Sequence, residues 1–360
     1  MKIVIAGDWH SDLHEEPAEQ ALRQLGHETV RFPWHGYFKP AGALAALRPI
    51  YRAQDKYLFG PQVRRLNADL ADCVRNSVPH ALLVYRGSHI YAETLRQCRR
   101  ASPHTLLVGY NNDDPFSPLY PRWQWRHFVA AIREYDLMLA YRPHNVAEFR
   151  AAGARRVELL RSWYVPERNR PVELSEDERA RYACDVIFAG HYEEDGRLEY
   201  LEAVVRNGWK LRLFGHGYGW HPALRKSDSL RPFMPVRTVW GADYNKALCG
   251  ARIALCFLSR LNRDTYTRRS FEIPASGAMM LAAYSDDHAA LFHAGEEADF
   301  FRSPQELVGK LARYLGDEAL RARVAAAGRR RVLADGHDVV SRMRRLVEWI
   351  GEVREERRAA

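Results

Sequence analysis

The sequence predicts an α/β protein with two domains, each built around a parallel sheet. Short apolar runs alternate with segments of helical periodicity along the whole chain, which is typical of right-handed βαβ units. The 360 residues are enough for two domains of ordinary size. A polar, proline-bounded stretch at residues 166–171 interrupts the alternation. We therefore predict domains over residues 1–170 and 171–338, followed by a last helical segment at 339–360.

The first half begins with an apolar run at residues 2–6, which is too short for a signal peptide and is predicted as a strand. Residues 34–59, rich in proline, glycine and aromatic side chains, are predicted as a long excursion that shapes a substrate mouth. The other predicted segments are strands at 27–32, 80–85, 105–110, 137–140 and 157–160 and helices at 17–25, 61–76, 92–100, 125–134 and 146–151.

The second half repeats the alternation without any internal sequence repeat. The arginine-rich end of the chain, residues 354–358, is expected to be solvated. The predicted segments are strands at 185–189, 210–214, 253–258, 278–283 and 298–301 and helices at 198–207, 241–247, 306–315, 318–334 and 339–355.

The net charge of +9 and the isoelectric point near 9.3 indicate anionic partners. Nucleic acid, small anionic substrates and an anionic membrane surface all fit this balance. The arginines are spread along the chain, and neither an aromatic–basic repeat nor a zinc-binding pattern accompanies them. The sequence therefore predicts no nucleic-acid partner and leaves a peripheral membrane contact open. No apolar run reaches the ~18 residues needed to span a bilayer.

Five scattered cysteines show no metal-ligand spacing. Reduced core thiols in a cytoplasmic protein are the expected interpretation. The sequence likewise contains no evident acidic metal cage, so we predict that no metal is bound.

The stretch that carries most chemistry lies between the predicted strands 253–258 and 278–283. Thr267, Arg268 and Arg269 stand at the mouth of a short predicted helix that ends at Gly277, and Glu272 follows one turn later. Hydroxyls, cationic side chains and the N–H groups of a helix start can receive a diphosphate. A carboxylate repels phosphate but accepts hydrogen bonds from sugar hydroxyls. This combination indicates a nucleotide site.

The run from Arg269 to Ala278, Arg-Ser-Phe-Glu-Ile-Pro-Ala-Ser-Gly-Ala, resembles the signature of CgeB-type (spore maturation protein-like) glycosyltransferases, relatives of the family-4 enzymes. In the wider group, the second glutamate of a Glu-x7-Glu pattern holds the donor ribose. Glu272 matches that position, whereas Asp264 stands where the first glutamate is expected. The resemblance implies the GT-B fold, in which two Rossmann-like domains face each other across a cleft and the last helix crosses back to the N-terminal domain.

The same resemblance implies further donor-binding residues. Arg197, at the start of a helix, would support the leaving nucleotide. Gly215 and Gly217 belong to the run Gly-His-Gly-Tyr-Gly-Trp at residues 215–220, which would form a Gly-x-Gly-Trp turn near the nucleobase, and Tyr244 would border the base. A solvent-facing helix arginine and simple packing of the tyrosine remain the alternatives.

The loops after the first-half strands provide candidates for the acceptor side. His10 with Asp12, in the loop after residue 6, is a workable general base. Asp113 and Asp114, in an Asp-Asp-Pro-Phe element similar to one in the CgeB-like group, could bind acceptor hydroxyls. The alternatives are that Asp8 or Ser11 caps a turn and that the adjacent aspartates form Asx turns.

Together these features predict a cytoplasmic, metal-independent glycosyltransferase without a cofactor other than its nucleotide-sugar co-substrate, with a UDP-sugar favoured. The acceptor would be a glycan, a lipid-linked glycan or a protein, in bacterial surface glycan synthesis. A nucleotide-sugar 2-epimerase of the same architecture and a non-enzymatic nucleic-acid-binding protein are the alternatives.

Overall fold

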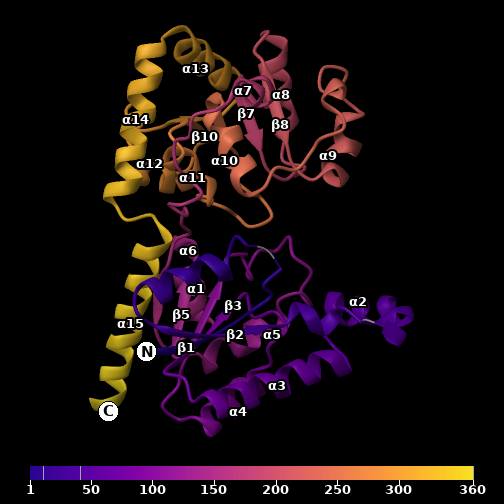
Figure 1. The fold of residues 1–360 in the computed structure, drawn as a ribbon, viewed down its shortest axis with the longest axis vertical. Coiled ribbons are helices and arrows are strands. Elements are labelled where there is room, and N and C mark those ends of the chain that lie inside the picture. The colour runs from indigo at the N-terminus through magenta and orange to yellow at the C-terminus, as the bar shows by residue number, and fades with distance from the viewer. Residues whose placement is uncertain (11, 41, 360) are drawn as a thin grey trace. The chain divides into compact units, whose positions relative to one another are not determined.

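A computed structural model describes residues 1–10, 12–40 and 42–359 and divides into two compact units. The first unit comprises Met1–Arg161 with Val339–Ala360, and the second comprises Ser162–Asp338. Each unit contains one parallel sheet covered by helices (Figure 1). This confirms the α/β class and the pair of Rossmann-like domains.

The sheet of the first unit has six strands in the order β2-β1-β3-β4-β5-β6, all parallel. β3 and β5 are buried along their whole length because helices cover both faces, and their sequences are accordingly apolar throughout. The strands are β1 (Lys2–Gly7), β2 (Glu28–Pro33), β3 (Ala81–Tyr85), β4 (Leu106–Asn111), β5 (Leu137–Ala140) and β6 (Val157–Leu159).

The helices of this unit largely follow the predicted periodicity, with one difference. The predicted excursion at residues 34–59 contains the 3₁₀ turns η1 (His35–Phe38) and η2 (Gly42–Leu47) and a ten-residue helix, α2 (Arg48–Tyr57). The others are α1 (Glu15–Gln24), α3 (Pro61–Ser77), α4 (Ala92–Ala101), α5 (Arg126–Ala131) with the 3₁₀ turn η3 (Ile132–Glu134), α6 (Pro143–Ala151) and α15 (Val339–Ala359).

The second unit has a five-stranded parallel sheet in the order β11-β10-β9-β7-β8. Counted from its own first strand, it repeats the 2-1-3-4-5 arrangement with which the sheet of the first unit begins. In such sheets the strand order reverses between the first and third strands, and ligands bind beyond the carboxyl ends at this switch point. The strands are β7 (Cys184–Ala189), β8 (Leu211–Phe214), β9 (Ala251–Cys256), β10 (Met279–Ala283) and β11 (Asp299–Phe301).

Three helices of the second unit differ from the prediction. α7 (Glu176–Tyr182) and α12 (Asp286–Leu291) were not expected, and α9 (Gly217–Leu224) replaces the predicted glycine loop. The remaining helices are α8 (Arg197–Arg206), the 3₁₀ turn η4 (Arg231–Phe233), α10 (Gly241–Cys249), α11 (Arg269–Ala275), α13 (Pro304–Gly316) and α14 (Glu318–Ala334).

The observed division of the chain falls earlier than the predicted boundary at residue 170. The Ser162 N–H donates to the Tyr266 hydroxyl oxygen over 2.8 Å, and the Tyr164 N–H donates to the His337 carbonyl over 3.1 Å. These bonds tie residues 162–165 to the second unit, so the polar stretch at 166–171 lies inside that unit. α15 belongs to the first unit, where it packs against α1.

Each unit has its own hydrophobic core. The core of the first unit contains the strand residues Val4, Leu82 and Leu107, which pack with apolar residues of helices that include α3 and α5. The core of the second unit contains Phe188 and Leu255. Among the residues that the structure describes, no helix is both long and apolar enough to cross a bilayer.

Candidate functional site

The segment between β9 and β10 places four predicted donor-site residues at one end of the second sheet. Tyr266 and Thr267 are buried, and α11 begins at Arg269. The Thr267 N–H donates to Ser270 Oγ over 3.0 Å, and Ser270 Oγ lies 2.8 Å from Nε2 of the buried His288. Because Nδ1 of His288 faces the Ala283 carbonyl at 2.9 Å, Nδ1 carries the hydrogen and the Ser270 hydroxyl donates to Nε2. These contacts fix the start of α11.

Glu272 has two protein partners. Its Oε1 forms an ion pair with Arg268 Nε at 2.8 Å, and its Oε2 accepts from the Tyr244 hydroxyl at 3.0 Å. The carboxylate is almost completely buried. Burial, followed by the nearby Glu272 charge, raises the pKa of Tyr244 well above its ordinary value, so the phenol stays protonated and keeps donating. Tyr244 thus orients Glu272, and its placement beside a base stays a prediction.

Arg269 differs from its neighbour because it forms no ion pair with any described residue. Its Nε is buried without a hydrogen-bond partner. Its guanidinium carbon lies 3.5 Å from the point where a Cβ on Gly190 would stand, directly after β7. The pKa of the adjacent His191 is lowered, by burial first and then by the Arg269 charge. Arg269 thus lies at the carboxyl ends of β7 and β9, the first and third strands of this sheet, where the switch point is found.

Arg197 is not available for the predicted contact with a leaving nucleotide. Its side chain is buried and is paired with Asp195 through two nitrogens, with Nε 2.8 Å from Oδ1. Nη1 also donates to the His191 carbonyl. The guanidinium further lies over the rings of Phe188 and Phe257. Its donors therefore hold the loop 190–196 in place, which corrects the predicted role.

The glycines of the predicted Gly-x-Gly-Trp turn are required by packing inside the protein. A Cβ on Gly215 would lie 2.2 Å from the Gly190 carbonyl oxygen and 2.5 Å from Trp220 Nε1. Trp220 is fully buried and donates to the same carbonyl over 2.9 Å. A Cβ on Gly217, the first residue of α9, would meet the His221 ring at 2.6 Å. Gly215 therefore allows a close approach between two loops, and Gly217 leaves room for His221 of its own helix.

Exposed rings gather beside these loops. The imidazoles of His191 and His216 stack with centroids 5.2 Å apart and planes 11° apart. His216 also lies against Tyr218 and Trp240, whose exposed fractions are 83% and 50%. Flat apolar faces that stay exposed at the carboxyl end of a sheet are suited to stacking on a planar ligand.

Asp264, at the place of the first glutamate in the family pattern, lies in a turn. Its Oδ2 accepts from the Ser259 N–H at 3.3 Å, and its own N–H donates to the Ser259 carbonyl at 2.8 Å. The neighbouring residues 260–261 are tied to the loop after β7, because Glu193 accepts from the N–H groups of Arg260 and Leu261. The two loops at the switch point therefore form one connected structure.

The first unit contains a cavity of about 600 Å³ at the carboxyl ends of β1 and β3, the switch point of its own sheet. Tryptophans and titratable side chains from five stretches of the chain form most of its wall. They are Asp8, His10, Trp34, His35, Asp55, Lys56, Leu58, Arg86, Ser88, His89, Trp123, Gln124 and Trp125.

Asp8 and His35 form a pair in this wall, which the sequence did not reveal. Nδ1 of His35 lies 3.3 Å from Asp8 Oδ1, and the rings of His35 and His10 lie 4.8 Å apart. A neutral His35 that donates from Nδ1 to Asp8 carries its lone pair on Nε2, a buried atom that makes no hydrogen bond in the described part of the chain. Burial lowers the pKa of His35 despite the Asp8 charge, which favours the neutral ring.

The remaining predicted acceptor-side residues lie in or near this cavity. His10 is exposed and lines it, whereas Asp12 is half-buried and does not. Ser11 lies outside the described residues. Asp113 pairs with Arg86 at 2.9 Å, and Arg86 lines the cavity.

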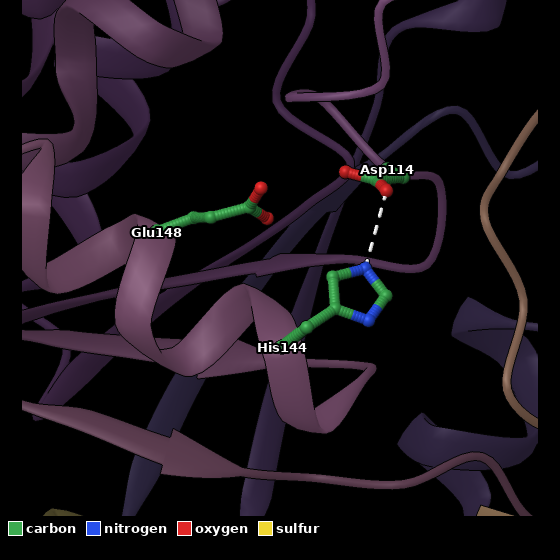
Figure 2. A group of neighbouring side chains, drawn as sticks. All are labelled: Asp114, His144 and Glu148. Atoms are coloured by element: carbon green, nitrogen blue, oxygen red, sulfur yellow. Dashed lines mark hydrogen bonds and ion pairs between the residues drawn. The ribbon is translucent and has the colours of Figure 1, made fainter.

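Asp114 is completely buried and faces His144 and Glu148 of α6 (Figure 2). Oδ2 lies 3.4 Å from His144 Nε2, while Oδ1 accepts from the Phe116 N–H at 3.1 Å and from Asn145 Nδ2 at 3.0 Å. The three ligand atoms lie within 4.8 Å of one another, close enough to surround a cation. The bond to Phe116 is the predicted Asx-type turn, and Asn145 also donates to Glu148 at 2.7 Å. The N–H groups of Phe116 and Asn145 therefore already occupy carboxylate lone pairs that a bound cation would need.

Comparison with known proteins agrees with this architecture. Residues 197–348 match the family model described as glycosyl transferase-like. No curated protein matches the chain.

Solved structures extend the likeness to the whole chain and establish the GT-B fold. Anabaena HepE in complex with UDP-glucose has a TM-score of 0.69 at 13% identity, covering 98% of this chain and 100% of that one. Sucrose-phosphate synthase from Thermosynechococcus elongatus has a TM-score of 0.72 at 13% identity, with 98% and 99% covered. A putative UDP-N-acetylglucosamine 2-epimerase from Listeria monocytogenes is also similar, with a TM-score of 0.60 at 12% identity and 99% and 97% covered.

Proposed function

We propose that the protein is a glycosyltransferase that moves a sugar from a nucleotide-sugar to a hydroxyl of an acceptor. The observation that carries the proposal is Arg269, a cationic side chain at the switch point of the second sheet that has no acidic partner among the described residues. It lies within the segment that matches the glycosyl transferase-like model. A guanidinium held in this way is suited to a diphosphate and to the charge that develops on it as it leaves.

Glu272 would accept from the donor ribose, with its position set by the neighbouring donors. Each carboxylate oxygen has two lone pairs, so bonds to Arg268 and Tyr244 leave acceptor capacity for two sugar hydroxyls. The half-buried ring of His216 and the exposed rings of Tyr218 and Trp240 offer a stacking surface for the base. A UDP-sugar is favoured because HepE, which shares the fold, was crystallised with UDP-glucose.

The cavity of the first unit would receive the acceptor. Indole rings such as Trp123 and Trp125 suit the apolar faces of sugar rings, and the charged side chains beside them suit hydroxyls. These features favour a glycan acceptor, free or lipid-linked, in bacterial surface glycan synthesis. His35, oriented by Asp8, is the better-placed base, and His10 beside it is the alternative.

The bond between the anomeric carbon and the diphosphate oxygen breaks, and a bond from the acceptor oxygen to that carbon forms. The acceptor proton passes to the imidazole, and the nucleoside diphosphate departs with its new charge stabilised by Arg269.

The decisive experiment measures binding of UDP, GDP, dTDP and CMP by calorimetry, followed by donor hydrolysis with the matching sugars. Arg269→Ala should weaken binding of the preferred nucleotide at least about tenfold, as expected for loss of a charge-assisted contact. The matched control is Arg206→Ala, an exposed arginine on α8 paired only with Glu202. Equal nucleotide affinity in wild type and Arg269→Ala would refute the donor site.

A nucleotide-sugar 2-epimerase is the second candidate, favoured by the similarity to the Listeria protein. An epimerase would convert its donor without an acceptor and release no nucleotide. A glycosyltransferase would release the nucleoside diphosphate in proportion to acceptor. Product analysis by chromatography separates the two.

We further propose a CgeB-type enzyme acting in the cytoplasm. The run from Arg269 to Ala278 supports the first part, and five cysteines without a disulfide fit a reducing compartment.

A further inference from the structure

A second cavity of the first unit lies at the amino ends of its strands, whereas the acceptor cavity lies at the carboxyl ends. It has a volume of about 450 Å³ and lies where β4 begins and α15 ends. Its wall consists of Pro103, His104, Leu106, Arg354, Arg357 and Arg358. Leu106 is the first residue of β4, whereas the acceptor cavity follows the last residues of β1 and β3. The proposed transfer reaction therefore makes no use of this second cavity.

One of the three arginines is fixed by a buried acid. Arg357 pairs with Asp136, which corrects the expectation that the whole end of the chain is solvated. Asp136 is 3% exposed, accepts from the Leu107 N–H at 2.8 Å, and also pairs with Arg99 at 3.0 Å and Arg155 at 3.7 Å. A single carboxylate is thus shared by three guanidinium groups, and a net positive charge remains.

The other two arginines have no acid of their own. Arg354 and Arg358 form no ion pair with any residue in 1–10, 12–40 or 42–359. Two glutamates of the same helix, Glu352 and Glu356, pair instead with Arg156, while Glu355 is exposed. The cations that line the cavity are therefore not neutralised by their helix.

The pKa shifts of two neighbouring groups agree with a positive electrostatic potential around this cavity. The pKa of His80 is lowered by burial and then by Arg354 and the chain's amino group. The pKa of Arg357 is lowered by burial and by Arg99 and Arg155, against the opposing effect of Asp136. Clustered guanidinium groups repel one another, and an anion that enters between them lowers the electrostatic free energy of the cluster.

We propose that this cavity, lined by Arg354, Arg357, Arg358 and His104, binds the phosphate group of a phosphorylated ligand. Guanidinium forks match phosphate oxygens in pairs, and an imidazole adds a donor. The volume exceeds that of a single phosphate, so the ligand carries a further group, which Pro103 and Leu106 can contact. Its source is either a water-soluble phosphorylated compound or the headgroup of an anionic phospholipid.

The variant Arg354→Gln/Arg358→Gln tests the proposal. Both side chains lack an internal ion pair, so their replacement should leave the fold intact, which thermal unfolding checks. The matched control is Arg323→Gln/Arg330→Gln on α14, which removes the same charge from two exposed arginines of the other unit. Wild type, variant and control are titrated with inorganic pyrophosphate by calorimetry. They are also sedimented with vesicles of phosphatidylcholine, alone or mixed with phosphatidic acid.

We expect the double variant to lose about tenfold or more in affinity for pyrophosphate, for the phosphatidic acid vesicles, or for both, with the control unchanged. Loss with pyrophosphate alone identifies a soluble ligand, and loss with vesicles identifies a lipid headgroup. Equal binding by wild type and double variant in both assays would overturn the proposal. An equal loss in the control would also overturn it, because total charge would then account for the binding.

Discussion

The hydroxyl of Tyr244 donates to Oε2 of Glu272 over 3.0 Å, and this bond joins α10 to α11 near the carboxyl ends of the strands of the second sheet. The carboxylate is buried, and its other oxygen is paired with Arg268. A buried charge held from both sides keeps one orientation, which a residue that binds a ribose requires.

Removing this hydroxyl in Tyr244→Phe should therefore affect both stability and binding. We expect the free energy of unfolding to fall by about 2 kcal/mol, the cost of losing a hydrogen bond to a charged group. UDP affinity should fall severalfold because Glu272 is less well positioned. Urea unfolding and calorimetry measure the two effects. Tyr218→Phe is the control. It removes the hydroxyl of an exposed ring in the same unit but leaves Glu272 in place, so it should change neither the free energy of unfolding nor the UDP affinity that Glu272 provides.

Two arginines that look alike in the sequence should behave in opposite ways. Arg197→Ala leaves Asp195 buried without its partner, so unfolding should become easier by about 3–5 kcal/mol. Arg269→Ala removes an unpaired guanidinium and should change stability by no more than about 1 kcal/mol while weakening nucleotide binding. Denaturant unfolding alongside UDP titration tests this contrast. Finding that Arg197→Ala is as stable as wild type would contradict the structural role assigned to it.

The sequence predicted the elements whose own residues favour them strongly. The strand Leu137–Ala140 is a continuous apolar run, and the helix Glu318–Ala334 is rich in alanine and arginine, and both have the predicted bounds. α7 was missed although its capping box, Ser175 with Glu178, is visible in the sequence. α9 was missed for a different reason. Its glycines and Pro222 disfavour a helix, and burial of Trp220 compensates.

The candidate site was only partly predictable. Glu272 and Arg269 stood out because they share one short segment with a family signature. The pairing of Asp8 with His35 depends on how the chain after β2 folds back over the loop after β1, and no local spacing encodes it. The engagement of Arg197 by Asp195 could have been inferred, since the two are neighbours, but its burial between Phe188 and Phe257 depends on the fold.

The pair of imidazoles in the first cavity allows the base to be identified. If His35 takes the acceptor proton, His35→Gln should lower kcat about 100-fold or more with donor affinity unchanged. His10→Gln should have a much smaller effect, because no carboxylate of the described residues orients this exposed ring. The pH profile provides a second readout. Since burial lowers the pKa of His35, wild-type activity should persist below the ordinary histidine pKa of 6.5 and fall at lower pH. A larger loss in His10→Gln would reverse the assignment.

Metal independence can be tested on the Asp114, His144 and Glu148 group. Because N–H donors of Phe116 and Asn145 already occupy Asp114 Oδ1, we expect turnover to be unchanged after dialysis against EDTA and after addition of Mg²⁺ or Mn²⁺. His144→Ala should likewise leave turnover within about twofold of wild type, a change of less than ~0.5 kcal/mol. Loss of activity on chelation that one of these cations restores, together with its loss in His144→Ala, would instead establish a metal site in this group.

Glu15 gives a pH dependence of stability with a defined sign. Its side chain is buried against Gly7, where a Cβ would lie 2.3 Å from Oε1, and burial raises its pKa above 4.5 despite the Trp9 N–H bond at 3.3 Å. The folded state therefore keeps this proton to higher pH than the unfolded state does. The contribution of Glu15 to stability is complete below pH 4.5 and is lost as the pH rises through the folded-state pKa.

Glu15→Gln removes this ionisation, so its stability relative to wild type should increase as the pH is raised from 4.5 towards neutrality. Urea unfolding of both proteins at several pH values measures the difference, in which the titration of all other groups cancels. Glu16→Gln, on the same turn of α1 but only half-buried, is the control, and its difference from wild type should vary less. A difference for Glu15→Gln that stays constant with pH, or that falls as the pH rises, would show that the buried carboxyl does not keep its proton in the folded protein.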